Sequence, residues 1–441
     1  MPDLFIFYLT HPAMNEHFLH HLWRFKLYQP GLYKTVKGEP IDIIHPGFHN
    51  TDAGPDFFNA KVKIGDTLWA GNIEIHQKSS DWHKHGHHTN RAFNNVILHV
   101  VTRHDREAST ANGTIVPTWI MEIPPPLMAA YQQLKQSRHS IPCLHGIKQV
   151  DPFVISTWLE RMMVEKLEIK VDLIQQLLKR YNNDWDEVLY VLLARNFGFG
   201  INADPFEQLA RQTPWRVLLR NSDDLLRLEA LLLGQAGFLT GLVAEEAYIQ
   251  RLQKEYHHLR HKYGLSPMPA YHWKFLRLRP SNFPTIRLVQ MAALFHKNRL
   301  SLDKIMKAPH TKTLSAMLNV SLEGYWLTHY RPEAPSPHKI KRLGPRSGDL
   351  IIINTLAPLV YGYGQLRDNE RLKDLALHWL ESIAPEENAI VNRWRNMDIR
   401  INSAFQTQAL IHLTQKYCRP KRCLHCRLGH LILASHSSAD R

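Results

Sequence analysis

The chain has 441 residues, of which 44% are apolar and only four are cysteines. This apolar content excludes general disorder, and the length suffices for two or three domains. The formal net charge of +14 favours a polyanionic partner, although solubility alone can account for it. No stretch has the roughly 20 apolar residues of a membrane helix, and no basic residue precedes the short apolar run from Leu4 to Leu9. Together with the few clustered cysteines, these features predict a cytoplasmic globular protein.

The first predicted elements are an amphipathic helix and a β-hairpin. The helix runs from Asn15, a suitable cap, to Phe25, and it carries Glu16 in its first turn. Residues 57–64 alternate polar side chains with an apolar face that begins at Phe58, and residues 67–70 resume the strand pattern after a Gly-Asp turn.

Residues 72–78 are predicted to form a strand with chemistry on one face. Alternation places Glu74, His76 and Lys78 together, while the isoleucines between them point to the opposite face. Asp56 precedes the neighbouring strand, so two carboxylates and a histidine lie in adjoining strands. Carboxylate oxygens are suitable ligands for Mg²⁺ or Mn²⁺, and such a site can hydrolyse phosphodiesters. The alternative is that Asp56 caps a turn and that Glu74 and His76 form a hydrogen-bonded pair.

A helical segment or ordered loop is predicted over residues 83–91, and a strand buried on both faces over residues 95–102. The order helix, strand, strand with Asp56, strand with Glu74, helical segment, strand resembles the PD-(D/E)xK nuclease superfamily over about the first quarter of the chain. The resemblance implies a restriction-endonuclease-like α/β domain with Asp56 and Glu74 as metal ligands and Glu16 as a further acidic residue. The lysine position of that family is occupied here by His76, so His76 or Lys78 is expected to activate water or stabilise charge.

The whole chain more closely resembles a family of uncharacterised bacterial proteins. The shared phrases are Gly-Pro-Asp-Phe, Gly-Asn-Ile-Glu-Ile-His and Ser-Ser-Asp-Trp, together with a cysteine-rich tail. This resemblance implies no activity.

Histidines gather in the same part of the chain and offer a rival metal site. Three imidazoles on converging strands suit zinc, and His76 and His99 are the best placed because each lies in a predicted strand. The histidines from His83 to His88 are interpreted as a solvated loop. If the histidines do bind zinc, the protein is a zinc-dependent hydrolase that acts on another substrate, which is a further hypothesis.

Three of the four cysteines follow one another near the end of the chain, as Cys418-x4-Cys423-x2-Cys426. The two-residue spacing lets both thiolates bind one metal from a single turn, as in zinc sites and iron–sulfur clusters. The fourth ligand is expected to be Cys143, or else His425 or His430. An upstream cysteine with a terminal triplet resembles the iron–sulfur nucleases of the PD-(D/E)xK superfamily, although the position and spacing differ. The alternative is a set of reduced cysteines in a basic tail.

Three basic runs are candidate nucleic-acid contacts, because arginine beside aromatic residues binds phosphate and stacks on bases. The first contains Arg277, Arg279 and Arg287, the second contains Lys341 and Arg342, and the third surrounds the cysteines with Arg419, Lys421, Arg422 and Arg427. The alternative is that these residues form salt bridges with helical glutamates.

The predicted fold is α+β, with a mixed sheet in the N-terminal domain and a mainly helical region after it. The expected boundaries are a nuclease-like domain over 1–123, a linker over 124–150, a helical region over 151–417 and a basic cysteine-rich tail over 418–441 that packs back on the body. The leading functional hypothesis is a divalent-metal-dependent nuclease acting on DNA or RNA. The alternative to catalysis is an inactive protein that binds nucleic acid.

Overall fold

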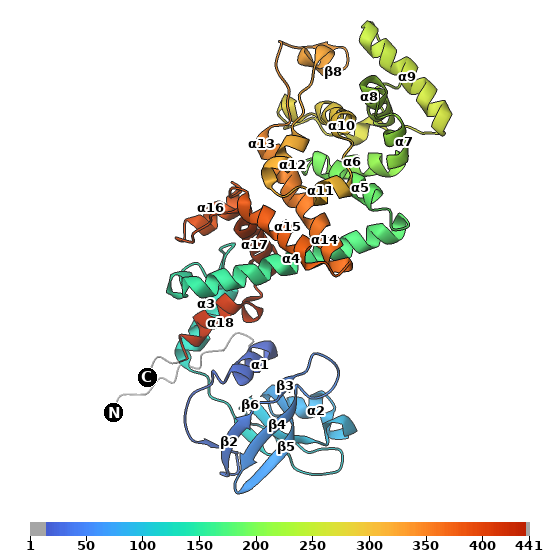
Figure 1. Ribbon diagram of the computed structural model, residues 1–441. Helices are drawn as coiled ribbons and strands as arrows, with labels where there is room; N and C mark the ends of the chain where they lie inside the picture. Colours follow the sequence, from blue (N-terminus) through green and yellow to red (C-terminus); the bar gives the residue numbers. More distant parts are fainter. Residues whose placement is uncertain (1–14, 438–441) are drawn as a thin grey trace. The chain divides into compact units, whose positions relative to one another are not determined.

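A computed structural model describes residues 15–437, and it divides the chain into two compact units (Figure 1). The first unit comprises the residues up to Trp158 together with those from Leu413 onward, and the second unit is Leu159–His412. The apolar run from Leu4 to Leu9 lies outside the described residues. Among the residues described, no helix is both long enough and apolar enough to cross a membrane.

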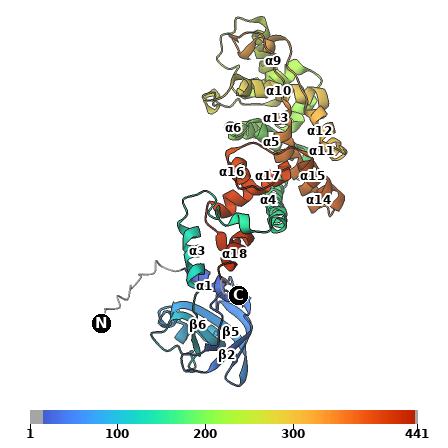
Figure 2. The same ribbon diagram turned by 90° about the vertical axis from the view of Figure 1, so that its left-hand side faces the viewer.

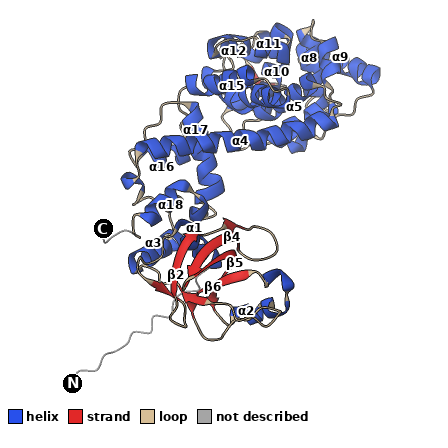
Figure 3. Cartoon of the chain, turned by 60° about the horizontal axis from the view of Figure 1, so that its bottom comes forward, coloured by secondary structure: helices blue, strands red, loops and turns tan. Residues whose placement is uncertain are grey.

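The first unit contains the mixed sheet that the sequence predicts (Figure 3). The sheet has the order β1-β2-β4-β5-β6-β7, and β3 pairs with β4. The pairs from β1 to β5 are antiparallel, whereas β5, β6 and β7 run parallel to one another. The strands are β1 (Tyr33–Lys34), β2 (Pro40–His45), β3 (Phe48–His49), β4 (Phe57–Ile64), β5 (Thr67–Lys78), β6 (Val96–Arg103) and β7 (Thr118–Ile120).

Helix α1 (Glu16–Phe25) begins as predicted, because the Asn15 side chain accepts a hydrogen bond of 2.9 Å from the His17 N–H. Its apolar stripe is buried except at Phe25, which is exposed, and Trp23 packs against Phe57 of β4 with ring centroids 6.4 Å apart. The helix therefore covers the start of β4, the part of the sheet where Asp56 lies.

Strand β4 departs from simple alternation at a bulge. The pairing with β5 shifts between Phe57 and Ala60, and Asn59 has a left-handed φ of 56° at this point. Phe57 is consequently fully buried, whereas Phe58 is only half-buried. The prediction that Phe58 belongs to the apolar face is therefore wrong. The extra residue of the bulge reverses the side-chain direction before Ala60, so Phe57 is buried in place of Phe58.

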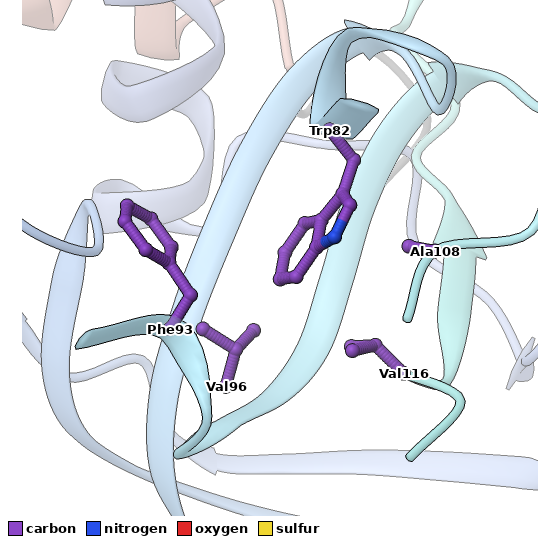
Figure 4. Packing of buried hydrophobic residues seen from close by; sticks show 5 residues of the cluster. All are labelled: Trp82, Phe93, Val96, Ala108 and Val116. Atoms are coloured by element: carbon purple, nitrogen blue, oxygen red, sulfur yellow. The ribbon is translucent and has the colours of Figure 1, made fainter. Parts of the chain in front are cut away.

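A hydrophobic cluster next to β5 and β6 anchors the connection between these strands (Figure 4). Its members are Trp82, Phe93, Val96, Ala108 and Val116. Trp82 lies at its centre and is fully buried, and its indole N–H donates to the Ser109 carbonyl at 2.8 Å. Trp82 belongs to helix α2 (Asp81–Lys84), after which come the short 3₁₀ turns η1 (His87–Thr89) and η2 (Arg91–Phe93). Burial of Trp82 thus holds the histidine-rich segment 83–88 next to the sheet.

The first unit also includes segments from after the sheet and from the end of the chain. Residues 124–150, which the sequence predicts as a linker, contain helix α3 (Pro125–Gln136) and the turn η3 (Ile147–Gln149). The terminal segment contains the π-helical turn η8 (Thr414–Cys418), the 3₁₀ turn η9 (Cys423–His425) and helix α18 (Arg427–Ala434), which packs against α3 and η3.

The second unit is helical, as predicted (Figure 2), and the boundary between the units falls within the long helix α4 (Pro152–Arg180). Helix α10 is buried along most of its length, and α8 packs closely on α9, where a Cβ on Gly234 would lie 2.2 Å from the Tyr256 ring. The helices are α5 (Trp185–Phe197), α6 (Ala203–Gln212), α7 (Trp215–Arg220), α8 (Leu225–Gln235), α9 (Ala247–Tyr263), α10 (Pro284–Asn298), α11 (Leu302–Met306), α12 (Thr311–Leu318), α13 (Pro345–Ile351), α14 (Ala357–Leu366), α15 (Glu370–Ser382), α16 (Ala389–Arg395) and α17 (Ala404–Leu413), with a π-helical turn η7 (Ile352–Leu356) and the strand pair β8 (His329–Arg331) and β9 (Ala334–Pro335).

Glu229 on α8 is a buried carboxyl group in the core of this unit. Only 3% of it is exposed, and it accepts hydrogen bonds from the Tyr248 hydroxyl and from the Trp326 indole N–H, the latter at 3.3 Å. Burial raises the pKa of Glu229 to about 7, and the two hydrogen bonds offset only part of this effect.

Stability of the helical unit is therefore expected to fall as the pH rises from about 4.5 to about 7. In this window the unfolded chain loses the Glu229 proton while the folded chain keeps it, which costs on the order of 3 kcal/mol across the window. Urea unfolding at pH 5 and pH 8 measures this loss. Glu229→Gln should remove the dependence, whereas the exposed control Glu245→Gln should keep it, and equal pH dependence in both variants would contradict the assignment.

Candidate metal centre

Asp56 and Glu74 lie side by side at the start of β4 and the middle of β5, and each carboxylate is fixed by the backbone of the other strand. Asp56 Oδ2 accepts from the Ile75 N–H at 2.9 Å, and Glu74 Oε2 accepts from the Asp56 N–H at 3.1 Å. The Glu74 side chain is 6% exposed and the Asp56 side chain 21% exposed. The pair is thus rigid, with Asp56 on its solvent side.

Imidazoles surround the Glu74 carboxylate. Glu74 Oε1 lies 3.0 Å from His87 Nε2 and 3.5 Å from His76 Nε2. His76 also contacts His85, with 3.1 Å between His76 Nε2 and His85 Nδ1. Candidate ligand nitrogens of His76, His85 and His87 all lie within 4.8 Å of one another. The strand, the turn η1 and the segment between them therefore bring three imidazoles to one point.

A fourth imidazole approaches from α1. His20 Nε2 lies 3.2 Å from Asp56 Oδ2, and His20 is one helical turn beyond Glu16 on the same side of the helix. Glu16 is close enough to contribute to the raised pKa of Glu74. The helix thus adds one imidazole and one acidic group to the site.

Two of the imidazole nitrogens around Asp56 and Glu74 lie close to a carboxylate oxygen without hydrogen-bond geometry. His87 Nε2 and His20 Nε2 are buried, and neither has a hydrogen-bond partner among the described residues despite its short distance to a carboxylate oxygen. Such contacts are expected where nitrogen and oxygen donors point toward a common cation. Oxygen and imidazole donors together fit a divalent ion such as Mn²⁺, Mg²⁺ or Zn²⁺.

The electrostatics of the site agree with a cationic ligand. Burial, and then the neighbouring Asp56 carboxylate, raises the pKa of Glu74 well above its ordinary value. Burial and the adjacent imidazoles lower the pKa of His76 to about 2. A divalent cation relieves both effects, because it offsets the repulsion between the carboxylates and binds imidazole in its neutral form.

His76 and His99, both predicted as metal ligands, have different surroundings. His99 is fully buried, and its Nε2 lies 2.9 Å from His76 Nδ1, so it orients the His76 ring from behind. Lys78 is exposed at the end of β5, and its backbone N–H donates to Asp81 Oδ2 at 3.2 Å. Neither His99 nor Lys78 has a contact with Asp56 or Glu74 among the described side-chain interactions.

The four cysteines also converge within the first unit. Burial raises the pKa of all four thiols, and neighbouring thiols add to this effect for Cys143, Cys418 and Cys423. Cys143, Cys418 and Cys426 are buried and Cys423 is half-buried. Of the three residues predicted as candidates for a fourth ligand, Cys143 is therefore the one grouped with the triplet.

The surroundings of Cys426 suit a thiolate. Burial raises the pKa of Cys426, and the backbone N–H groups of Gly429 and Leu428 and the Trp158 indole N–H, which favour the thiolate, offset part of this effect. Gly429 is required for this turn, since a Cβ there would lie 2.3 Å from the Cys423 carbonyl oxygen. Donors directed at sulfur and a tight turn between two cysteines fit a thiolate-bound metal centre.

The candidate nucleic-acid contacts in the helical unit differ in their exposure to solvent. Arg277, Arg279 and Arg342 are exposed, whereas Arg287 and Lys341 are buried. Arg287 donates to Gln290 at 2.9 Å and to Asn282 at 2.6 Å, and Lys341 donates to the Trp326 carbonyl at 2.5 Å. For these two residues the prediction is corrected, because their charged groups are used inside the unit and do not reach a ligand at the surface.

Comparison with known proteins gives one match. The sequence model of a family described as "Protein of unknown function (DUF2851)" matches residues 16–389. No curated protein and no solved structure matches the chain.

Proposed function

We propose a function for this chain, which belongs to the DUF2851 family of proteins of unknown function: it is a divalent-metal-dependent nuclease that hydrolyses phosphodiester bonds in DNA or RNA. The observation that carries the proposal is the rigid pair of Asp56 and Glu74, held by reciprocal backbone hydrogen bonds and faced by buried imidazole nitrogens. Two preoriented carboxylates in adjoining strands are suited to phosphodiester hydrolysis.

Asp56, Glu74 and His87 would hold the ion, with His76 held in place by His99 and His85. When bound, Mg²⁺ or Mn²⁺ supplies a Lewis acid that neutralises charge on the scissile phosphate and lowers the pKa of water. The protein orients the ligands. The buried side chains of Glu74, His76 and His99 exclude bulk water from their side of the site. The partly exposed side of Asp56 is left for the substrate.

His20 is the residue best placed to move a proton. It contacts Asp56 Oδ2 at 3.2 Å, and its side chain is 13% exposed. His76 is less suited to this role, because both of its ring nitrogens contact other histidines. Lys78 is exposed at the strand end, which leaves His20 as the proposed general acid or base.

A zinc-dependent hydrolase is the second candidate, and the grouping of His76, His85 and His87 favours it. A third reading is a protein that binds nucleic acid without cleaving it. The three differ in metal preference and in turnover, so one set of assays separates them.

The test is cleavage of labelled single- and double-stranded DNA and RNA by the purified full-length chain with Mg²⁺, Mn²⁺ or Zn²⁺, beside calorimetric titration of Mn²⁺. Cleavage with Mg²⁺ or Mn²⁺ that is lost in Asp56→Asn supports the nuclease. Activity confined to Zn²⁺ and to substrates other than nucleic acids supports the zinc hydrolase. Nucleic-acid binding by a folded, Mn²⁺-binding protein with no turnover supports the third reading.

We further propose that the four cysteines hold one metal centre, either zinc or an iron–sulfur cluster. The proposal is supported by the burial and mutual proximity of the thiols and by the N–H groups around Cys426. Such a centre links the segment after Leu413 to Cys143 within the same unit. Reduced thiols in this role fit a cytoplasmic location, which we also propose.

A further inference from the structure

A cavity of about 550 Å³ lies beside the carboxylate site, between α1 and the terminal segment of the first unit. Side chains from α1 form one wall, and residues from Leu424 to Leu431, around Cys426, form another. His49 and Thr51, near Asp56, complete it. The volume is in the range of pockets that hold a molecule the size of a nucleotide.

The charged groups that line this cavity are all basic. Arg24 and Arg427 line it together with histidines from α1, β3 and the terminal segment, and none of its lining residues is acidic. Neither arginine takes part in an ion pair among the described residues. Unpaired guanidinium groups gathered around a cavity without carboxylates favour an anionic ligand, and their planar donors match phosphate oxygens.

Aromatic surface lies beside these charges. Phe25 is 41% exposed and Trp158 lines the same cavity. The Arg24 guanidinium lies 5.2 Å from the centroid of the Phe25 ring, and the centroids of the His430 and Phe25 rings are 4.2 Å apart. A base or ribose can pack on such rings while its phosphate meets the arginines.

The cavity adjoins the carboxylates through His20. This residue lines the cavity and also contacts Asp56 at 3.2 Å, and the His49 ring lies 5.6 Å from the His20 ring. A second cavity of about 110 Å³, with Lys135, Lys421 and Arg422 in its lining, shares His17 and His425 with the first. The basic surface therefore continues away from the carboxylate site.

We propose that this cavity binds a phosphorylated nucleotide, the terminal nucleotide of a nucleic-acid strand, with the phosphate on Arg24 and Arg427 and the base or ribose on Phe25 and Trp158. The identity of this ligand as part of the substrate rests on the proposed nuclease function, but its binding does not require cleavage. The resulting specificity is for strands that carry a terminal phosphate.

The test is fluorescence anisotropy of labelled single-stranded oligonucleotides with a 5′-phosphate, a 3′-phosphate or hydroxyl ends, with no divalent metal added. The full chain is compared with Arg24→Ala/Arg427→Ala and with Arg106→Ala, which removes an exposed arginine outside the cavity. One phosphorylated end should bind at least about tenfold more tightly than hydroxyl ends, and the double variant should lose this preference while the control keeps it.

Equal affinity for phosphorylated and hydroxyl ends, or equal losses in the double variant and the control, would overturn the proposal. Free deoxyadenosine monophosphate is then added as a competitor. If it binds as tightly as the strand, the site is assigned to free nucleotides, and if it binds more weakly, the site is assigned to strand ends. Arg24→Lys/Arg427→Lys, which retains charge, and thermal unfolding of each variant separate loss of the ligand contacts from loss of folding. Measuring Glu74→Gln as well separates this proposal from the nuclease, since end preference should persist there without cleavage.

Discussion

Replacing Glu74 by glutamine is expected to weaken Mn²⁺ binding and to lower the rate of nucleic-acid cleavage, each by about 100-fold or more. Glutamine keeps the shape of the side chain and one acceptor for the Asp56 N–H, but it cannot ionise to supply the negative charge that a cation next to His87 requires. The effect is therefore expected on metal affinity and turnover with little effect on folding.

Isothermal titration with Mn²⁺ and single-turnover cleavage measure the two losses separately. Asp66→Asn is the matched control, because it removes one carboxylate from the exposed turn of the same hairpin. Unchanged Mn²⁺ affinity in Glu74→Gln would exclude Glu74 as a ligand, even if cleavage had fallen. Loss of affinity in His87→Ala as well would place this imidazole in the same site.

Local patterns were sufficient to predict the elements that position the carboxylates. Asn15 and the apolar stripe predicted α1, the alternation after Gly71 predicted the face of β5 that carries Glu74, and both agree with the structure. These features depend on spacing within one element, which the sequence shows directly. The helical region was predictable for the same reason, whereas the mixed sheet was implied by the resemblance to the PD-(D/E)xK superfamily, because spacing within one strand does not show the direction of its neighbours.

The bulge at Asn59 was not predictable from alternation. Its left-handed backbone reverses the side-chain direction for Phe57 and Phe58, and only the pairing with β5 reveals it. A lone asparagine between apolar residues carries too weak a signal for such a bulge.

The remaining imidazoles of the site depend on tertiary contacts. The polar composition of the segment 83–88 is typical of a solvated loop, yet burial of Trp82 holds this segment so that His87 reaches Glu74. His85 remains exposed while one ring nitrogen contacts His76. His20 carried one usable signal, since it follows Glu16 by one helical turn on the face that meets Asp56.

If the four cysteines hold a metal as proposed, replacing Cys426 or Cys143 by serine is expected to remove this metal and to destabilise the first unit by roughly 3 kcal/mol or more. The two residues come from segments far apart in the sequence that belong to the same unit, so a metal bound by both would stabilise the packing of α18 on α3 and η3. Each variant should therefore also make the segment after Leu413 more sensitive to protease.

Metal content per chain, visible absorption and thermal unfolding of the purified protein measure these effects, and a visible chromophore with bound iron distinguishes a cluster from zinc. His425→Ala and His430→Ala are the controls. Both histidines line the neighbouring cavity, and the sequence also allowed either of them as the fourth ligand of the cysteine centre. Full metal content in both controls, with loss in Cys143→Ser, assigns a four-thiolate centre. A folded wild-type chain without metal, or a Cys426→Ser variant that retains it, would show that the convergence of the thiols has a purely structural origin in core packing.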